Sequence, residues 1–128
     1  MEINELEKIL EKCWCKETSV DPDRWLDKNS AWGQCVPTSL VVNDYFGGEI
    51  VWAIAKLPDG EEISHYSNKL NGREIDLTRK QFPVGTKIPQ GIPREKGFQT
   101  TRDYLLSSKK VIERYNLLRQ KIEQYSKK

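Results

Sequence analysis

Hydrophobic and polar positions at the start of the chain follow the period of an α-helix. Apolar residues recur every three or four positions, with glutamates and lysines between them, at Ile3, Leu6, Ile9, Leu10 and Cys13. This spacing predicts a short amphipathic helix whose apolar stripe, including Cys13, faces the core. The polar stretch 16–31 that follows predicts a surface loop held in place by Trp14 and Trp25.

A second helix is predicted from Cys35 onward. Apolar side chains again have helical spacing there, and Gly47-Gly48 is a strong stop signal. Pro37 is tolerated only in the first turn of a helix, where its missing N–H has no intrahelical partner to lose. We therefore expect Cys35 at or just before the N-terminus of this helix.

Three β-strands are predicted next, over residues 49–57, 62–70 and 73–78. The turn signals Pro58-Asp59-Gly60 and Asn71-Gly72 separate them, which favours an antiparallel meander. Residues 79–99 are rich in proline and glycine and predict an irregular surface segment. A helical stripe then runs to the end of the chain and predicts one C-terminal helix over about 100–126.

These elements predict a single α+β domain over residues 1–128, with its core in about 13–83. The helix that begins at Cys35 packs against the small antiparallel sheet, and the N- and C-terminal helices cover the remaining apolar surface. The length of 128 residues is that of one ordinary domain, which buries a core without disulfides or metals. A hydrophobic fraction of 37% excludes a disordered chain.

The charge balance names no macromolecular partner. Lys and Arg number 21 against 19 Asp and Glu, and a net charge of +2 does not favour nucleic acid or an anionic membrane. Residues 94–128 are net +6, which we interpret as the solvated face of the C-terminal helix. The longest uncharged stretch, 29–43, is shorter than a membrane span, and an acidic N-terminus predicts no signal peptide. Three cysteines, an odd number, favour a reducing compartment, so we expect a cytoplasmic protein.

The candidate chemistry starts from the single histidine. A chain with one histidine and one cysteine at a helix start offers the pair Cys35 and His65. The N-terminus of a helix stabilises a thiolate, because its free N–H groups and the helix dipole present positive charge. Gly33 lets the backbone bend and leaves the thiol accessible. A neighbouring imidazole then completes the thiolate–imidazolium pair that performs acyl transfer.

A third member follows from the pairing of the last two strands. If 71–72 is a two-residue hairpin loop, paired positions sum to 143, and His65 lies opposite Thr78. Asp76 then shares a face with His65 as its diagonal neighbour, at roughly 7–8 Å, within reach of the imidazole. Asn68, the other candidate, falls on the opposite face. A register slip of one residue exchanges the two, so the choice of Asp76 depends on the turn.

Two neighbours of the cysteine are weaker candidates. The side-chain amide of Gln34 can help to hold an oxyanion, with the backbone N–H of Cys35 as second donor. Trp32 either forms a wall of the site or packs beneath the loop.

No metal site and no cofactor are expected. Cys13, Cys15, Cys35 and His65 make a formal zinc ligand set, but the Cys-x-Cys spacing is shorter than structural zinc sites prefer. Asp21 and Asp23 flank a proline, which is typical of a turn.

The motifs also resemble known proteins. A Gly-Gln-Cys at the head of a helix, followed by a histidine on one strand and an aspartate on the next, resembles the core of papain-like and transglutaminase-like cysteine enzymes. The chain more closely resembles the YunG-type family of small bacterial proteins, over most of residues 13–83 and more weakly over the C-terminal helix. The segments that carry this resemblance are Trp14-Cys15-Lys16-Glu17-Thr18-Ser19, Trp32-Gly33-Gln34-Cys35, Asp44-Tyr45-Phe46-Gly47-Gly48, Ser64-His65-Tyr66 and Glu74-Ile75-Asp76-Leu77-Thr78. The resemblance implies the fold and the Cys35–His65–Asp76 assignment, and it names no reaction.

We therefore expect a cysteine-dependent acyl-transfer enzyme, an amide or thioester hydrolase or a transferase, acting on an acyl- or amide-containing substrate. Water and an amine are both possible acceptors, and the same three residues serve either outcome. The alternative is a non-catalytic binding module that uses the Cys35–His65 cleft or the basic C-terminal helix. The residues neither support nor exclude an accessory protein of a toxin or immunity system.

Overall fold

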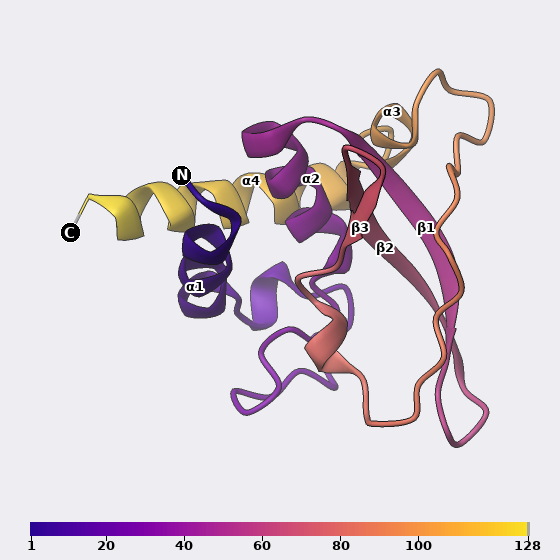
Figure 1. The fold of residues 1–128 in the computed structure, drawn as a ribbon. Coiled ribbons are helices and arrows are strands. Elements are labelled where there is room, and N and C mark those ends of the chain that lie inside the picture. Colours follow the sequence, from indigo (N-terminus) through magenta and orange to yellow (C-terminus); the bar gives the residue numbers. More distant parts are fainter. Residues whose placement is uncertain (128) are drawn as a thin grey trace.

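The computed structural model describes residues 1–127 and has an α+β architecture (Figure 1). A three-stranded antiparallel sheet and four α-helices form the described part of the chain, so the expected α+β class with a small antiparallel sheet is confirmed. In chain order the elements are α1 (Ile3–Cys13), the 3₁₀-helix η1 (Lys16–Thr18), α2 (Cys35–Phe46), β1 (Glu49–Lys56), β2 (Glu62–Leu70), β3 (Arg73–Ile75), the 3₁₀-helix η2 (Arg79–Gln81), α3 (Thr101–Leu105) and α4 (Lys109–Ser126).

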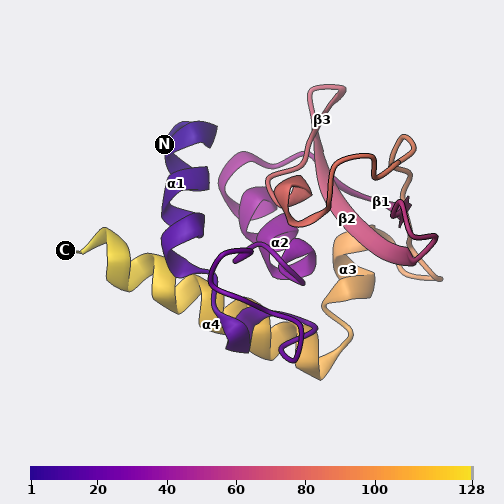
Figure 2. The same ribbon diagram turned by 90° about the horizontal axis from the view of Figure 1, so that it is seen from below.

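Helix α2 lies at the centre of the molecule. One side of it packs on the sheet, mainly on β2, and another packs on α4, which in turn contacts α1 (Figure 2). Because neighbours cover α2 on more than one side, even its polar residues Thr38 and Ser39 are buried. Within residues 1–127, no helix combines the length and the apolar character that crossing a bilayer requires.

The sheet has the order β1-β2-β3, with β1 paired to β2 from Glu49–Lys69 to Lys56–Glu62. Strand β3 pairs with β2 at three positions, from Asn68–Ile75 to Leu70–Arg73. Asn71 and Gly72 have φ values of 51° and 80°, as a two-residue hairpin turn of type I′ requires. The two-residue turn and the pairing sum of 143 are therefore confirmed over these three pairs.

The third strand is shorter than the predicted 73–78, because it ends at Ile75. The cause is the side chain of Asp76. Its Oδ1 accepts hydrogen bonds from the backbone N–H and the hydroxyl of Thr78, at 3.3 and 3.4 Å. Aspartate favours such local turns, and here the turn takes the chain out of the sheet and into η2.

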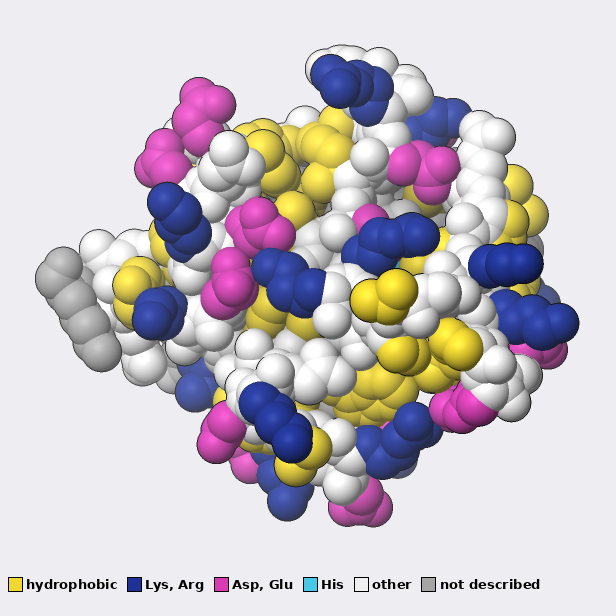
Figure 3. Space-filling model, turned by 60° about the horizontal axis from the view of Figure 1, so that its bottom comes forward, with side chains coloured by type: hydrophobic (Ala, Val, Ile, Leu, Met, Phe, Trp, Pro, Cys, Tyr) yellow, Lys and Arg dark blue, Asp and Glu magenta, His cyan; other side chains and the backbone are white. Residues whose placement is uncertain are grey.

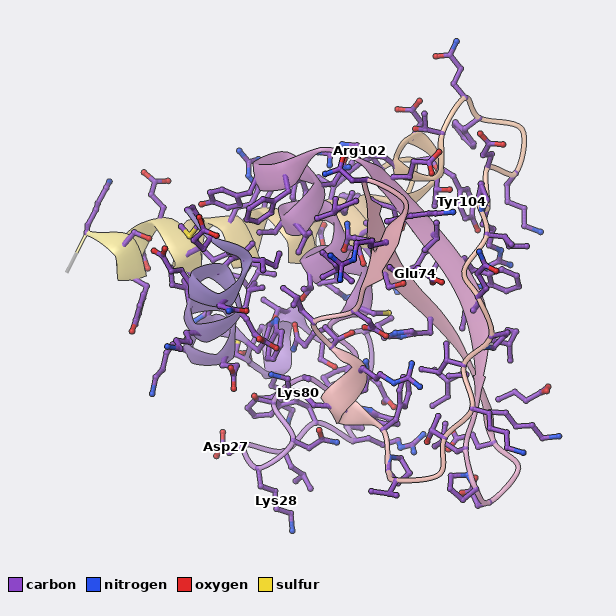
Figure 4. All side chains as sticks on the ribbon, in the orientation of Figure 1. Asp27, Lys28, Glu74, Lys80, Arg102 and Tyr104 are labelled. Atoms are coloured by element: carbon purple, nitrogen blue, oxygen red, sulfur yellow. The ribbon has the colours of Figure 1, made fainter. Side chains whose placement is uncertain are left out.

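The predicted C-terminal helix over 100–126 is in fact two helices, α3 and α4. The side chain of Ser108 accepts a hydrogen bond from the backbone N–H of Val111 and caps the start of α4. A serine that caps one helix interrupts the helix before it, which the apolar stripe alone does not reveal. Arg102 of α3 (labelled in Figure 4) then joins the two helices to α2 through Asp44 and the hydroxyl of Tyr115.

Candidate functional site

Cys35 is the first residue of α2, in the position that its sequence context predicts. The bend before it depends on Gly33, whose φ is 73° and whose missing side chain leaves room for Ser19. A Cβ at Gly33 would lie 2.2 Å from Oγ of Ser19. That hydroxyl donates to the carbonyl of Trp32, and the backbone N–H of Val20 donates to the carbonyl of Gly33, so the preceding loop is fastened to the bend.

The start of α2 presents unused hydrogen-bond donors beside the thiol. The first backbone bond of the helix runs from the N–H of Thr38 to the carbonyl of Gln34. Among the hydrogen bonds of residues 1–127, none uses the backbone N–H of Cys35 or of Val36. Free N–H groups at a helix N-terminus favour negative charge, so this end of α2 suits a thiolate or an oxyanion.

His65 lies on β2, beyond the end of its pairing with β3, and only 2% of its surface is exposed. Its Nε2 is 2.7 Å from Oδ2 of Asp76. The turn that ends β3 directs this carboxylate, since Thr78 holds the other oxygen, Oδ1. The ring of Phe82 packs edge-on against the imidazole, with centroids 5.0 Å apart. The structure thus brings His65 and Asp76 together.

Asn68, the alternative partner for His65, makes a different contact. Its side-chain amide donates a 3.0 Å hydrogen bond to the carbonyl of Ser39, which fastens β2 to α2.

The electrostatics of His65 favour its charged form. Burial lowers the pKa of the imidazole, but the hydrogen bond to Asp76 and the interaction with Cys35 outweigh that effect and raise the pKa from 6.5 to about 9. In the part of the chain that the structure describes, Nδ1 is buried and has no hydrogen-bond partner. Asp76 occupies Nε2, so Nδ1 is the nitrogen left for Cys35.

Cys35 and His65 line a cleft of about 460 Å³ between the 20–36 segment and the β1–β2 hairpin. Apolar side chains of Val20, Trp32, Val36 and Ile63 form much of its wall. Arg24 lies at the rim, with two hydrogen bonds of 2.8 and 3.2 Å to Glu61 and its guanidinium 4.4 Å from the ring centre of Trp32. Figure 3 shows apolar side chains gathered on this side of the molecule, with charged ones around them.

A wider groove of about 590 Å³ lies between α2 and α4, on the other side of α2 from the sheet. Neither a cysteine nor the histidine lines it. The cleft at Cys35 is therefore smaller than this groove, but it is the one lined by the cysteine and the histidine.

The two weaker candidates have different positions. Trp32 lines the cleft, donates from Nε1 to Asp21 and packs edge-on against Phe82. Gln34 is fully buried and does not line the cleft, and its Nε2 donates a 2.8 Å hydrogen bond to the carbonyl of Cys15. The backbone N–H groups of Cys35 and Val36 are therefore better placed to hold an oxyanion than the Gln34 amide.

The formal zinc ligands do not gather at one point. Cys13 is buried among the core residues, and Sγ of Cys15 is 3.7 Å from the hydroxyl of Thr18. Across residues 1–127, no group of three or more His, Cys, Asp or Glu side chains is arranged to hold a metal ion.

The sequence pattern of the family described as "YunG protein" matches residues 2–127. The chain belongs to the YunG family. It is 33% identical over 97 residues to "Uncharacterized protein YunG" of Bacillus subtilis (strain 168), an alignment that covers 74% of this chain and 76% of that protein. No solved structure matches the chain. The YunG-type resemblance of the motifs is thus confirmed.

Two residues of this YunG family site come from the segment predicted as irregular. Oε1 of Gln81 accepts a hydrogen bond from the backbone N–H of Gly33, and its Nε2 donates to the carbonyl of Thr78. Phe82, next in the chain, packs against His65. Because this stretch has no periodicity, the sequence does not show whether a glutamine in it is buried at the site or exposed to solvent.

Proposed function

We propose that this YunG family protein is a cysteine-dependent acyl-transfer enzyme, with Cys35 as nucleophile, His65 as proton carrier and Asp76 as the group that orients His65. One observation carries the proposal. The imidazole is buried, with Nε2 bound to Asp76 and with Nδ1 left unpaired within the described chain beside the cleft that Cys35 lines. An unpaired buried polar atom is costly, so its presence favours a functional explanation.

The reaction begins when the Cys35 thiolate attacks the carbonyl carbon of an amide or thioester, forming a C–S bond. The carbonyl oxygen becomes an oxyanion, for which the free N–H groups of Cys35 and Val36 are suitable donors. As the oxyanion collapses, the bond to the leaving group breaks and the leaving amine or thiol takes the proton of the His65 imidazolium. The acyl group is then a thioester on Cys35.

Release of the acyl group uses the same residues. Neutral His65 removes a proton from water, or from an acceptor amine, as that molecule attacks the thioester. The C–S bond breaks and the Cys35 thiolate is restored beside a protonated His65. Water yields a carboxylic acid and a hydrolase, whereas an amine yields a new amide and a transferase.

Asp76 has two functions in this scheme. Its hydrogen bond to Nε2 holds the ring and leaves Nδ1 to exchange the proton with Cys35, and its charge stabilises the imidazolium. The pKa of about 9 at His65 supports this role, because it keeps the imidazole protonated at neutral pH.

The fold proposal is that the core corresponds to that of papain-like and transglutaminase-like enzymes. A nucleophile at the start of a helix, packed on an antiparallel sheet that carries the histidine, supports it. A cytoplasmic location belongs to the same proposal, since the chemistry requires Cys35 to be a reduced thiol.

Alkylation by iodoacetamide across pH, with mass spectrometry to locate the modified cysteine, tests the proposal. Cys15 is more exposed than Cys35, so accessibility alone predicts that Cys15 reacts first. Activation by His65 predicts instead that Cys35 is alkylated fastest, near neutral pH. In His65→Ala, Cys35 should no longer be alkylated faster than Cys15.

The opposite order would contradict the proposal. If Cys15 or Cys13 reacts faster than Cys35 in the folded wild-type protein, Cys35 is not an activated thiol. That result would favour the alternative, a binding module that uses the cleft without catalysis.

A further inference from the structure

Arg94 lies at the edge of the cleft, where it contacts two of the lining residues, and it forms no ion pair within residues 1–127. Its Nη1 donates to the hydroxyls of Tyr66 and Ser64, at 3.2 and 3.5 Å, and both of these residues line the cleft. Of the arginines in residues 1–127, Arg24 and Arg102 form ion pairs with carboxylates, whereas Arg94 forms none, like Arg73, Arg79, Arg114 and Arg119. The hydrogen bonds and ring contacts of its guanidinium within residues 1–127 are therefore all with neutral groups.

Aromatic rings hold this guanidinium in place. It lies 4.5 Å from the ring centre of Trp52 and 6.0 Å from that of Tyr104, which comes from α3 and is labelled in Figure 4. The indole N–H of Trp52 donates to Ser64, so the ring and the hydroxyl that contact Arg94 are themselves fixed. Stacking of this kind orients a guanidinium without neutralising it.

Free donors remain on Arg94. The side-chain hydrogen bonds within residues 1–127 use only Nη1, which leaves the N–H groups of Nε and Nη2 for another group. The Tyr66 phenol connects this end of the cleft to the nucleophile. Burial raises the pKa of Tyr66, the hydrogen bond from Arg94 lowers it, and the charge of Cys35 raises it, so Tyr66 interacts with both residues.

The charges along the cleft give it a direction. Glu61 and Glu62 lie at the hairpin end, where Arg24 compensates only one of the two. Glu62 and Tyr66 are four residues apart on β2, or roughly 13 Å at 3.3 Å per residue. The hairpin end of the cleft is therefore acidic, whereas Arg94 contacts the cleft at Ser64 and Tyr66.

We propose that Arg94 binds a carboxylate of the substrate, so that the acyl substrates of this protein are amides or thioesters that carry a carboxylate group. One planar guanidinium with adjacent free donors matches one carboxylate, whereas a phosphate dianion would call for more than one positive charge. The proposal deepens the proposed function and rests on Cys35 as the residue that is acylated.

The test compares two alkylating reagents of nearly equal size, anionic iodoacetate and neutral iodoacetamide, at Cys35. Both release iodide and form the same type of thioether, so the ratio of their rates cancels the intrinsic reactivity of the thiol. A second pair, a maleimide with a carboxyalkyl chain and its amide counterpart, extends the reach toward Arg94. Cys15 in the same protein is the internal reference.

For each reagent pair, the ratio of the anionic to the neutral reaction rate should be higher at Cys35 than at Cys15. Arg94→Gln should lower the ratio at Cys35 about fivefold or more. Arg94→Lys keeps the positive charge and should retain part of the preference of Cys35 for the anionic reagents. It is the variant to compare with the wild type if Arg94→Gln does not fold. Arg119→Gln is the matched control, because Arg119 also stacks on a tyrosine, 5.1 Å from the ring centre of Tyr115, but lines the groove at α4.

Equal ratios in the wild type and both Arg94 variants, with both reagent pairs, would overturn the carboxylate site. That result is distinct from failure of the proposed function, which is read from the absolute rate of Cys35 with iodoacetamide. An activated Cys35 without an Arg94-dependent ratio leaves the enzyme proposal and removes this one. A slow Cys35 that keeps the Arg94-dependent ratio removes the enzyme proposal and the acyl substrate with it, and leaves only the binding of a carboxylate by Arg94.

Discussion

Replacing Asp76 with alanine removes the carboxylate that holds His65 by a 2.7 Å hydrogen bond. In the wild-type protein the pKa of His65 is raised from 6.5 to about 9, although burial alone lowers it. Without Asp76, burial is opposed only by Cys35, so the pKa of His65 should fall below its wild-type value. A smaller fraction of His65 would then be protonated, and alkylation of Cys35 should shift to higher pH.

The same shift sets a pH-dependent stability. Because the folded state raises the pKa of His65, it binds the proton more tightly than the unfolded chain does. At about 1.4 kcal/mol per pKa unit, the raised pKa contributes at most about 3–4 kcal/mol to the free energy of unfolding. This contribution is fully present below pH 6.5 and is lost as the pH rises through about 9. The difference in the free energy of unfolding between the wild type and Asp76→Ala should therefore become smaller as the pH rises from 6.5 to about 9.

Nuclear magnetic resonance makes the measurement direct, since His65 is the one histidine among 128 residues. Its ring signals should titrate near pH 9 in the wild type and at a clearly lower pH in Asp76→Ala. Asn68→Ala is the control. Asn68 donates a hydrogen bond to the carbonyl of Ser39, so its loss should destabilise the fold without changing the pH at which His65 titrates. Titration of the wild type near 6.5, or a larger shift for Asn68→Ala than for Asp76→Ala, would refute the reasoning.

Three further predictions concern the framework of the site. Gly72→Val should lower the free energy of unfolding by roughly 1 kcal/mol or more, because φ is 80° in a turn with open space around it; an unchanged denaturation midpoint would contradict the turn. Gly33→Ala should cost more than Gly72→Ala in the same assay, because its Cβ also meets Ser19. Leu118→Ala should cost about 2–5 kcal/mol, since Leu118 is fully buried, and a loss below 1 kcal/mol would argue against its core position.

The elements that sequence predicts best are those specified by local periodicity. The stripe that ends at Cys13 and the glycine pair after Phe46 locate α1 and α2, because the spacing of apolar residues and a stop signal both act within a few residues. The Asn71-Gly72 turn likewise sets the register of β2 and β3. The break between α3 and α4 escapes this reasoning, because it depends on a serine cap rather than on the apolar pattern.

The contact between His65 and Asp76 arises differently from the way that strand pairing predicts it. The pairing argument extends the ladder to Thr78, yet the ladder ends at Ile75. The Asp76 side chain accepts two hydrogen bonds from Thr78, and that turn, rather than the pleat, brings its second oxygen to the imidazole. Parity still separates Asp76 from Asn68, because the confirmed register assigns Asn68 to a contact with α2.

The parts of the site that sequence does not predict are those that hold two turns together. Gln81 receives the N–H of Gly33 and donates to the carbonyl of Thr78, so one amide joins the bend before Cys35 to the turn that positions Asp76. Each turn has its own local signal, a glycine in one and an aspartate in the other. Their relative position has no local signal, because it depends on a residue 48 positions away from Gly33. The geometry of the site is therefore a property of the packed chain, even though Cys35, His65 and Asp76 can be selected from the sequence.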